Sequence, residues 1–179
     1  MSISLEEWQY PIGRYRAKRT FSDTEIHTAI ATLKRFPSDL KKALEQCTTN
    51  DLDQGYRPGG WTIRQLVHHI ADSHMHSYMR CKYAYLEETP TIKGYEEKNW
   101  AEKSPDALSF DIEASVKILE GVHERWTYFF EQLNKEEWLR EYSHPERTEN
   151  FPLAEVAYFY AWHAEHHLNH ILNYLKFKA

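Results

Sequence analysis

The sequence predicts an all-α protein, a four-helix bundle with a long crossover loop and short extra helices. Three observations lead to this prediction. Apolar residues recur at three- and four-residue steps over four long segments of the 179-residue chain. No convincing strand alternation, internal repeat or low-complexity tract is visible. Turns and one long mixed segment separate the four helical segments, as in bundles with a crossover connection.

The first long helix is expected from Ser22 to about Cys47, where apolar residues keep a helical spacing. The dipeptide Phe36-Pro37 lies inside this segment. Proline has no backbone N–H and therefore cannot donate a hydrogen bond to the preceding turn of a helix. We therefore expect this helix to be bent near Pro37 or to form in two pieces. The segment RPGGW that follows predicts a turn.

A second helix is expected from about Thr62 to Glu88. Thr62 followed by Gln65 resembles a capping box, in which two side chains satisfy each other's backbone N–H groups at the start of a helix. Pro90 ends this helix. The stretch after it is mixed in character, with one helical turn expected around residues 96–102. Its length makes it the candidate crossover connection.

The third helix is expected within residues 110–133, where apolar residues again repeat at three- and four-residue steps. Asn134 with Glu137 indicates the start of a short helix. The segment YSHPERTENFP that follows is expected to be a loop. From about Leu153 a last helix is expected to run to Tyr174 or beyond. Four such helices favour a bundle, and bundles can place metal sites between facing helices.

The composition predicts one globular, cytoplasmic domain spanning residues 1–179. The net charge of -5, with histidines neutral, argues against a nucleic-acid partner. The chain does not begin with a basic region followed by a long apolar segment, and no run of about eighteen apolar residues occurs. Secretion and a membrane span are therefore not expected. Cys47 and Cys81 form no CxxC pair, and we expect them to be reduced thiols.

Histidine is the compositional outlier, with 11 residues, and four of them fall within YAWHAEHHLNHIL, residues 160–172. On a helical wheel, His167 lies inside the apolar stripe of the last helix and His163 lies one turn earlier at its edge. These two imidazoles can therefore point at one site. His170 lies near His163 in angle and is an alternative ligand, whereas His166 is turned further away. The competing interpretation is a set of surface or hydrogen-bonded core histidines.

Two imidazoles rarely complete a metal site, because catalytic zinc normally takes three protein ligands and a water. The second helix offers His68, His69, His74 and His76 as the third donor. The wheel places His69 on a suitable flank and turns His68 away from the apolar stripe, but it excludes neither His74 nor His76. The cluster is not an HExxH protease motif, since alanine follows its first histidine. No phosphate-binding glycine loop or GxSxG elbow occurs, so no catalytic residue is assigned.

Five segments, in order along the chain, resemble the DinB/YfiT group of metalloproteins. They are YPIGRY near the start, YRPGGWTIRQLVHHIADSHMHSYMRCK from Tyr56, LEETPTIKGYEEKNW from Leu86, YSHPE from Tyr142 and AYFYAWHAEHHLNHI from Ala157. The resemblance covers nearly the whole chain. It implies a four-helix bundle of DinB/YfiT type, often a homodimer, with a divalent metal, zinc or nickel, held by three histidines. Carried over position by position, these ligands are His69, His163 and His167.

The resemblance further implies an enzyme that acts on a small-molecule substrate. It would be either a metal-dependent hydrolase or a transferase that joins the low-molecular-weight thiol bacillithiol to electrophiles. A divalent ion on three neutral imidazoles keeps an open position, where it lowers the pKa of water to about 7 or holds a thiol as thiolate. The alternative is a non-catalytic metal-binding or ligand-sensing bundle with a structural ion. A fourth protein ligand, such as His170, His76 or a carboxylate, would favour that alternative.

Overall fold

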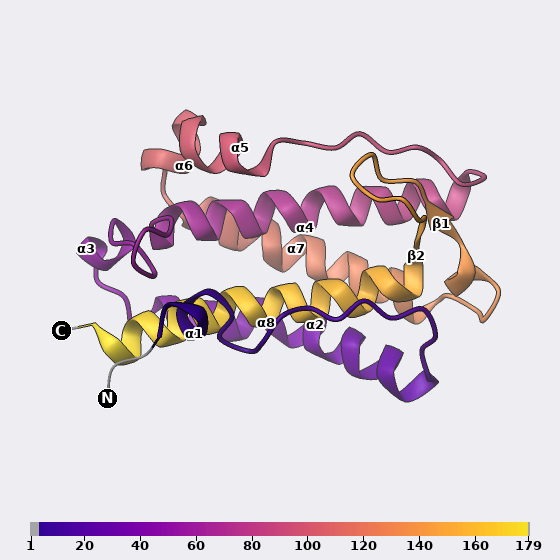
Figure 1. Ribbon diagram of the computed structural model, residues 1–179, viewed down its shortest axis with the longest axis horizontal. Helices are drawn as coiled ribbons and strands as arrows, with labels where there is room; N and C mark the ends of the chain where they lie inside the picture. Colours follow the sequence, from indigo (N-terminus) through magenta and orange to yellow (C-terminus); the bar gives the residue numbers. More distant parts are fainter. Residues whose placement is uncertain (1–3, 179) are drawn as a thin grey trace.

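Four long helices form the body of the protein in its computed structural model, which describes residues 4–178. They are α2 (Asp23–Leu44), α4 (Ile63–Leu86), α7 (Glu113–Glu131) and α8 (Leu153–Phe177). Helices α2 and α4 each pack against both α7 and α8, so that the four enclose one core (Figure 1). The predicted all-α four-helix bundle is therefore confirmed. Each long helix begins and ends within a few residues of its predicted range.

Short elements connect and cover the bundle. The helical ones are α1 (Leu5–Gln9), α3 (Thr49–Leu52), α5 (Glu97–Lys103), α6 (Pro105–Ser109) and the 3-10 helix η1 (Glu137–Leu139). Helices α5 and α6 lie on the long connection from α4 to α7 and pack against α4, so this connection is the predicted crossover (Figure 1). The expected turn at residues 96–102 corresponds to α5. The apolar pattern does not predict α1, α3 or α6, because they are too short to repeat it.

The segment expected to be a loop between η1 and α8 contains a small antiparallel hairpin. Strand β1 (Glu141–Tyr142) pairs with β2 (Phe151–Pro152), with Tyr142 opposite Phe151. Two-residue strands are too short to show the alternation that predicts a strand, so the expectation of an irregular loop is wrong here. Both aromatic side chains are buried, and their ring centroids lie 5.6 Å apart. The hairpin therefore closes the end of the core where α8 begins (Figure 1).

Helix α2 is continuous through Pro37, so the expectation that it might form in two pieces is wrong. Pro37 is buried, and the packing of α2 against α7 and α8 outweighs the roughly 3 kcal/mol that proline costs inside a helix. Because Pro37 has no N–H, it cannot donate to the carbonyl of Leu33, four residues earlier. That carbonyl instead accepts a hydrogen bond from His123 of α7, at 2.6 Å.

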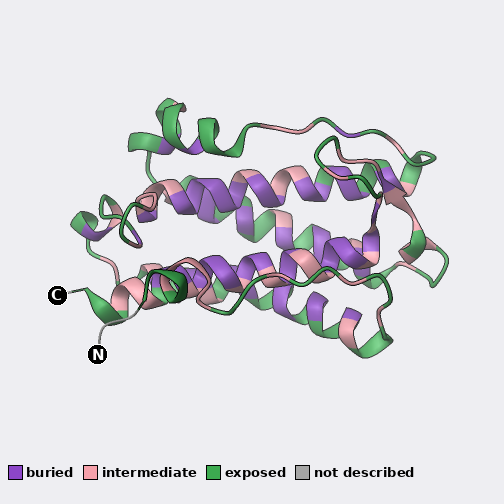
Figure 2. Ribbon diagram, viewed as in Figure 1, coloured by how far each residue is buried: buried purple, intermediate pink, exposed green. Residues whose placement is uncertain are grey.

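The core lies between the long helices, whose inward faces are buried. The outward faces of α2 and α7 are exposed, whereas α4 and α8 are largely buried or half-buried (Figure 2). Its largest fully buried side chains include Trp126, Phe36 and Phe130. Packing of such amphipathic faces, rather than helix propensity, supplies most of the stability of helices in proteins. Because charged and polar residues recur on the outward faces, no helix within residues 4–178 is long and apolar enough to cross a membrane.

The predicted capping box at the start of α4 is confirmed. The Oγ1 atom of Thr62 accepts a hydrogen bond from the backbone N–H of Gln65 at 3.1 Å. In return, the Oε1 atom of Gln65 accepts one from the backbone N–H of Thr62 at 2.9 Å. Two donors that a helix start would leave free are thereby satisfied. The cap fixes the start of α4 about two turns before His69.

Replacing Thr62 with alanine should lower the free energy of unfolding by about 0.5–2 kcal/mol, because the N–H of Gln65 loses its acceptor. Urea denaturation followed by circular dichroism measures this change. Thr28→Ala is the matched control, since Thr28 is exposed inside α2 and caps no helix. Its effect should stay within about 0.5 kcal/mol. Equal losses in the two variants would contradict a stabilising role of the cap.

Candidate metal centre

Three buried histidines from two facing helices meet inside the bundle. His69 comes from α4, and His163 and His167 come from consecutive turns of α8. One ring nitrogen of each residue lies within 4.8 Å of those of the other two. The ring centroids of His69 and His167 are 5.2 Å apart, and those of His163 and His167 are 4.4 Å apart. The structure thus brings together the three residues that the family resemblance indicates.

The three imidazoles are neutral at ordinary pH. Burial lowers the pKa of His69 to about 4. Burial, reinforced by the neighbouring histidines, holds the pKa of His163 and of His167 well below the ordinary value. Only a neutral imidazole offers a nitrogen lone pair to a metal. Protons therefore compete little with a metal for these nitrogens at neutral pH.

The donor chemistry of this group fits a divalent transition metal. Within residues 4–178, neither ring nitrogen of His69 forms a hydrogen bond with another residue, so its lone pair is free for a metal. No carboxylate or thiol joins the group in this part of the chain. Imidazole ligands suit zinc, nickel, copper and iron, whereas magnesium and calcium prefer oxygen ligands.

Two other histidines of α4 have partners away from this group. His68, which the helical wheel turns outward, is buried beneath the segment that leads into α7. Its Nδ1 lies 2.8 Å from Oγ of Ser115, and its Nε2 lies 3.2 Å from the carbonyl oxygen of Phe110. His76 stacks on Tyr95, with 4.3 Å between ring centroids. These contacts make His68 and His76 structural residues of the crossover side of the bundle.

His74 and His123 lie behind the three-histidine group and are hydrogen-bonded to it in series. The Nε2 atom of His74 lies 2.9 Å from Nδ1 of His163, and its Nδ1 atom lies 2.7 Å from Nε2 of His123. The sequence pattern left His74 open as a ligand, and His123 was missed because it stands alone on α7. Its signal is a polar residue at a core position of the apolar repeat, three residues before Trp126.

His166 and His170 form a second group with His167, in which ring nitrogens also lie within 4.8 Å of one another. The helical wheel turns His166 away from the bundle interior, yet it is buried. It stacks on Trp162, with 4.5 Å between ring centroids, and Tyr10 lies 6.3 Å away. The N-terminal segment runs along α8 (Figure 1) and covers a face that four helices alone would leave open. His166 is therefore not the solvent-facing residue that its place on the wheel suggests.

The stability of the metal-free protein should fall as the pH is lowered from about 6.5 toward 4. Burial lowers the pKa of His123 to about 4, against the opposing effect of its hydrogen bond to Leu33. An unfolded histidine has a pKa of about 6.5, so between these values only the unfolded chain binds the proton. His123 should therefore lower the free energy of unfolding by up to about 1.4 kcal/mol for each pH unit in this range. Urea denaturation of wild type and His123→Gln should show a smaller pH slope in the variant. Equal slopes would contradict this.

The fold and the three-histidine group define a class of protein, a four-helix bundle of the kind that holds a metal between facing helices. Residues 32–171 match the family model of the DinB superfamily, and the chain belongs to this family. The resemblance that the sequence shows to the DinB/YfiT group is thereby confirmed. The matched region contains all three histidines of the group, together with His74, His123 and most of α8.

Relatives in Bacillus match the chain over nearly its whole length. YfiT of Bacillus subtilis, named as a candidate metal-dependent hydrolase, is 41% identical over 162 residues, 90% of each chain. A protein of Bacillus cereus with the same kind of name is 41% identical over 172 residues, 96% of this chain and 98% of that one. The solved structure of YfiT, described as having an unusual four-helix bundle topology, gives a TM-score of 0.91 at 39% identity. It covers 95% of this chain and 97% of that one.

Proposed function

We propose that this protein is a divalent-metal-dependent enzyme in which His69, His163 and His167 hold the ion. The observation that carries the proposal is the buried group of three neutral imidazoles, free of carboxylates, between α4 and α8. Zinc is the ion we expect first and nickel second, since both accept imidazole ligands. The naming of relatives as metal-dependent hydrolases supports a catalytic rather than a structural ion.

A divalent ion held by three protein ligands keeps a position for water or substrate and lowers the pKa of the nucleophile that occupies it. The role of the surrounding residues would be to keep the site neutral and apolar. The ring of His69 lies 5.0 Å from that of Trp61, and the ring of His163 lies 6.0 Å from that of Phe159, between centroids. Such walls lower the local dielectric and strengthen electrostatic interactions at the site.

The nucleophile would come from water or from a cosubstrate rather than from a cysteine of the chain. Burial raises the pKa of the Cys81 thiol to about 12 and also raises that of Cys47. Both thiols therefore stay protonated and unreactive at neutral pH. Two reactions are compatible with this site. One is hydrolysis of a small ester or amide, and the other is transfer of a low-molecular-weight thiol such as bacillithiol to a small electrophile.

Assays of the zinc-loaded and nickel-loaded protein, with and without a thiol, test this proposal. A nitrophenyl ester reports hydrolysis, and a chlorinated nitrobenzene with bacillithiol reports thiol transfer. We expect turnover of one of them that is lost after chelation and in His69→Ala. Turnover that requires the thiol supports the transferase, and turnover without it supports the hydrolase. Activity that survives both chelation and the substitution would contradict a metal-dependent mechanism. A metal-loaded protein without either activity would favour a ligand-sensing bundle with a structural ion.

A homodimer is the oligomeric state we propose, on the resemblance to the DinB/YfiT group. We do not expect a nucleic-acid partner, because the net charge of -5 would repel a phosphate backbone. Size-exclusion chromatography with light scattering should give a mass about twice the 21.4 kDa of one chain. A mass that stays at that of one chain across the concentrations needed for the assays would contradict the dimer.

A further inference from the structure

Three buried histidines outside the ligand set connect it to backbone carbonyl groups of the bundle. We propose that His74 and His123 are positioning residues that fix which nitrogen of His163 carries the proton, and that His170 does the same for His167. The inference deepens the proposed function, because it rests on His163 and His167 as ligands for its effect on metal affinity. The predicted proton positions apply to the metal-free protein, so they can be tested without any metal.

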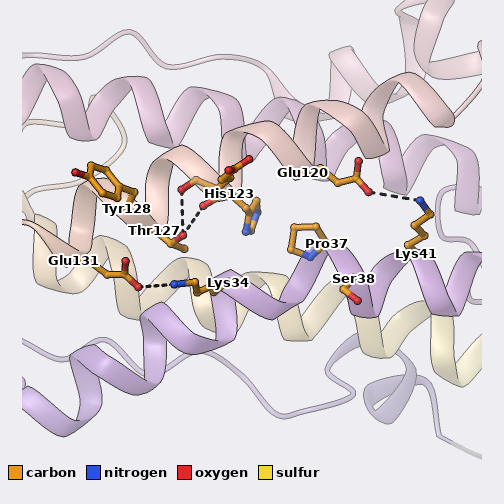
Figure 3. Close-up of a pocket in the computed structure, with 10 residues that line it drawn as sticks. Lys34, Pro37, Ser38, Lys41, Glu120, His123, Thr127, Tyr128 and Glu131 are labelled. Atoms are coloured by element: carbon orange, nitrogen blue, oxygen red, sulfur yellow. Dashed lines mark hydrogen bonds and ion pairs between the residues drawn. The ribbon is translucent and has the colours of Figure 1, made fainter.

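The first relay is the hydrogen-bonded series from the Leu33 carbonyl through His123 and His74 to His163. It begins at a carbonyl that a proline leaves free. Figure 3 shows His123 of α7 beside Pro37 of α2. In an uninterrupted helix the N–H of residue 37 would donate to the carbonyl of Leu33, but proline has no N–H. The Nδ1 atom of His123 lies 2.6 Å from that carbonyl oxygen. A carbonyl oxygen only accepts, so Nδ1 of His123 must carry the proton.

The proton on His123 decides the arrangement of the next two rings. A neutral imidazole has one donor and one acceptor nitrogen. Since Nδ1 of His123 donates, its Nε2 accepts from Nδ1–H of His74 at 2.7 Å. The Nε2 atom of His74 then accepts from Nδ1–H of His163 at 2.9 Å. His163 is left with a free lone pair on Nε2, the form that a metal ligand requires.

Burial keeps this relay in its neutral form. His74 and His123 are at most 1% exposed, and among the residues that the structure describes their ring nitrogens form hydrogen bonds only with other imidazoles and a carbonyl oxygen, so a charge there would be buried without an acidic partner. The charged side chains at the nearby surface form ion pairs with one another, Lys34 with Glu131 and Lys41 with Glu120 (Figure 3). Within residues 4–178, none of these four forms a hydrogen bond with His123. The relay therefore ends at the backbone of α2 rather than at a surface charge.

A second, looser relay serves His167. The Nε2 atom of His170 lies 3.3 Å from the carbonyl oxygen of Gln9, at the end of α1. That nitrogen must therefore donate, which leaves Nδ1 of His170 as an acceptor. It lies 3.4 Å from Nδ1 of His167, so the proton of His167 is placed on Nδ1 and its Nε2 keeps the lone pair. The same reasoning thus gives His163 and His167 the same tautomer, with the proton on Nδ1. It also gives His170 a role beside His167 other than that of a fourth ligand.

The proton positions can be measured in the metal-free, full-length protein. Long-range proton–nitrogen NMR correlations of protein with nitrogen-15-labelled histidine distinguish the two tautomers of each ring. We expect the proton on Nδ1 in His74, His123, His163 and His167, and on Nε2 in His170. A proton on Nε2 of His163 in the folded, metal-free protein would overturn the first relay. This result does not depend on whether any metal binds.

Variants of His123 test the consequence for the metal. His123→Phe removes the acceptor of His74, so the protons of His74 and His163 should move to Nε2. Metal affinity should then fall by about 10–100-fold, the usual cost of losing a partner behind a ligand. His123→Gln keeps an acceptor and a donor and should retain the Nδ1–H tautomer of His163, with most of the affinity. His68→Phe, which removes a buried histidine of α4 outside both relays, is the matched control and should bind like wild type.

Isothermal titration with zinc, read beside circular dichroism, separates the possible outcomes. Unchanged zinc affinity and an unchanged His163 tautomer in folded His123→Phe would overturn the positioning role. An equal loss of affinity in His68→Phe would overturn it as well, since any buried substitution would then suffice. If even the wild type binds no zinc but its tautomers are as expected, the relay stands and the proposed metal function fails. Wild-type zinc binding with the opposite tautomers would overturn the relay and leave the proposed metal function intact.

Discussion

Replacing His163 with alanine should remove most of the bound metal while leaving a helical protein. The substitution takes away one of three nitrogens that converge within 4.8 Å. Loss of a partner behind a ligand already costs about 10–100-fold in affinity, so loss of the ligand itself should cost at least about 100-fold. Metal content after dialysis measures the effect, and circular dichroism reports whether the helices remain. His167→Ala should behave in the same way.

His166→Ala is the matched control for these two variants. His166 is buried on the same helix and lies one residue before His167, but it is outside the group that contains His69. Its replacement should change metal content much less. Equal metal content in the three alanine variants would remove the ligand assignment. Loss of metal in His166→Ala and His167→Ala, but not in His163→Ala, would point instead to the second group, which His166 forms with His167 and His170.

Replacing Trp126 with alanine should lower the free energy of unfolding by about 3–5 kcal/mol, the usual cost of truncating a large buried aromatic side chain. Trp126 is fully buried, and its ring packs against those of Phe130 and Tyr160, at 5.5 and 5.2 Å between centroids. It also lies 6.0 Å from the ring of His74. The substitution therefore opens a cavity where the core meets the histidine relay.

Urea denaturation of the chelated protein measures this loss without a contribution from metal binding. Trp126→Phe is the matched control, because it keeps an apolar ring in the same place and should lose less than the alanine variant. A loss below about 1 kcal/mol in Trp126→Ala would contradict its place at the centre of the core. Equal losses in the two variants would show that ring volume is not what stabilises this region.

Periodicity predicts the long helices well, because each has a face that must be buried against its neighbours. Periodicity fails to predict the secondary structure where contacts between elements outweigh local sequence preferences. Pro37 argues for a break in the first helix, but burial of α2 holds that helix together. The hairpin of β1 and β2 is too short to leave a pattern, and its two aromatic residues could have been assigned to a loop as easily as to a strand.

The candidate site is predictable to the extent that it lies on one helix. His163 and His167 follow from their four-residue spacing on an apolar stripe. The third residue does not, since the wheel of the second helix allows His69, His74 and His76 alike, and only the family resemblance selects His69. Which of them faces α8 depends on how the two helices are rotated and packed, and that information is not contained in either helix alone. The role of His123 likewise cannot be predicted from α7 alone, because its partner is the Leu33 carbonyl of α2.

Elemental analysis of the untagged protein beside its His69→Ala variant tests the central claim most directly. His69 is the only one of the three proposed ligands that α4 supplies, so its loss should open the site without disturbing the α8 pair. We expect about one transition-metal ion per chain in the wild type and its loss in the variant. A wild-type protein that stays metal-free after incubation with zinc, nickel and manganese would contradict the account, as would a variant that keeps its metal.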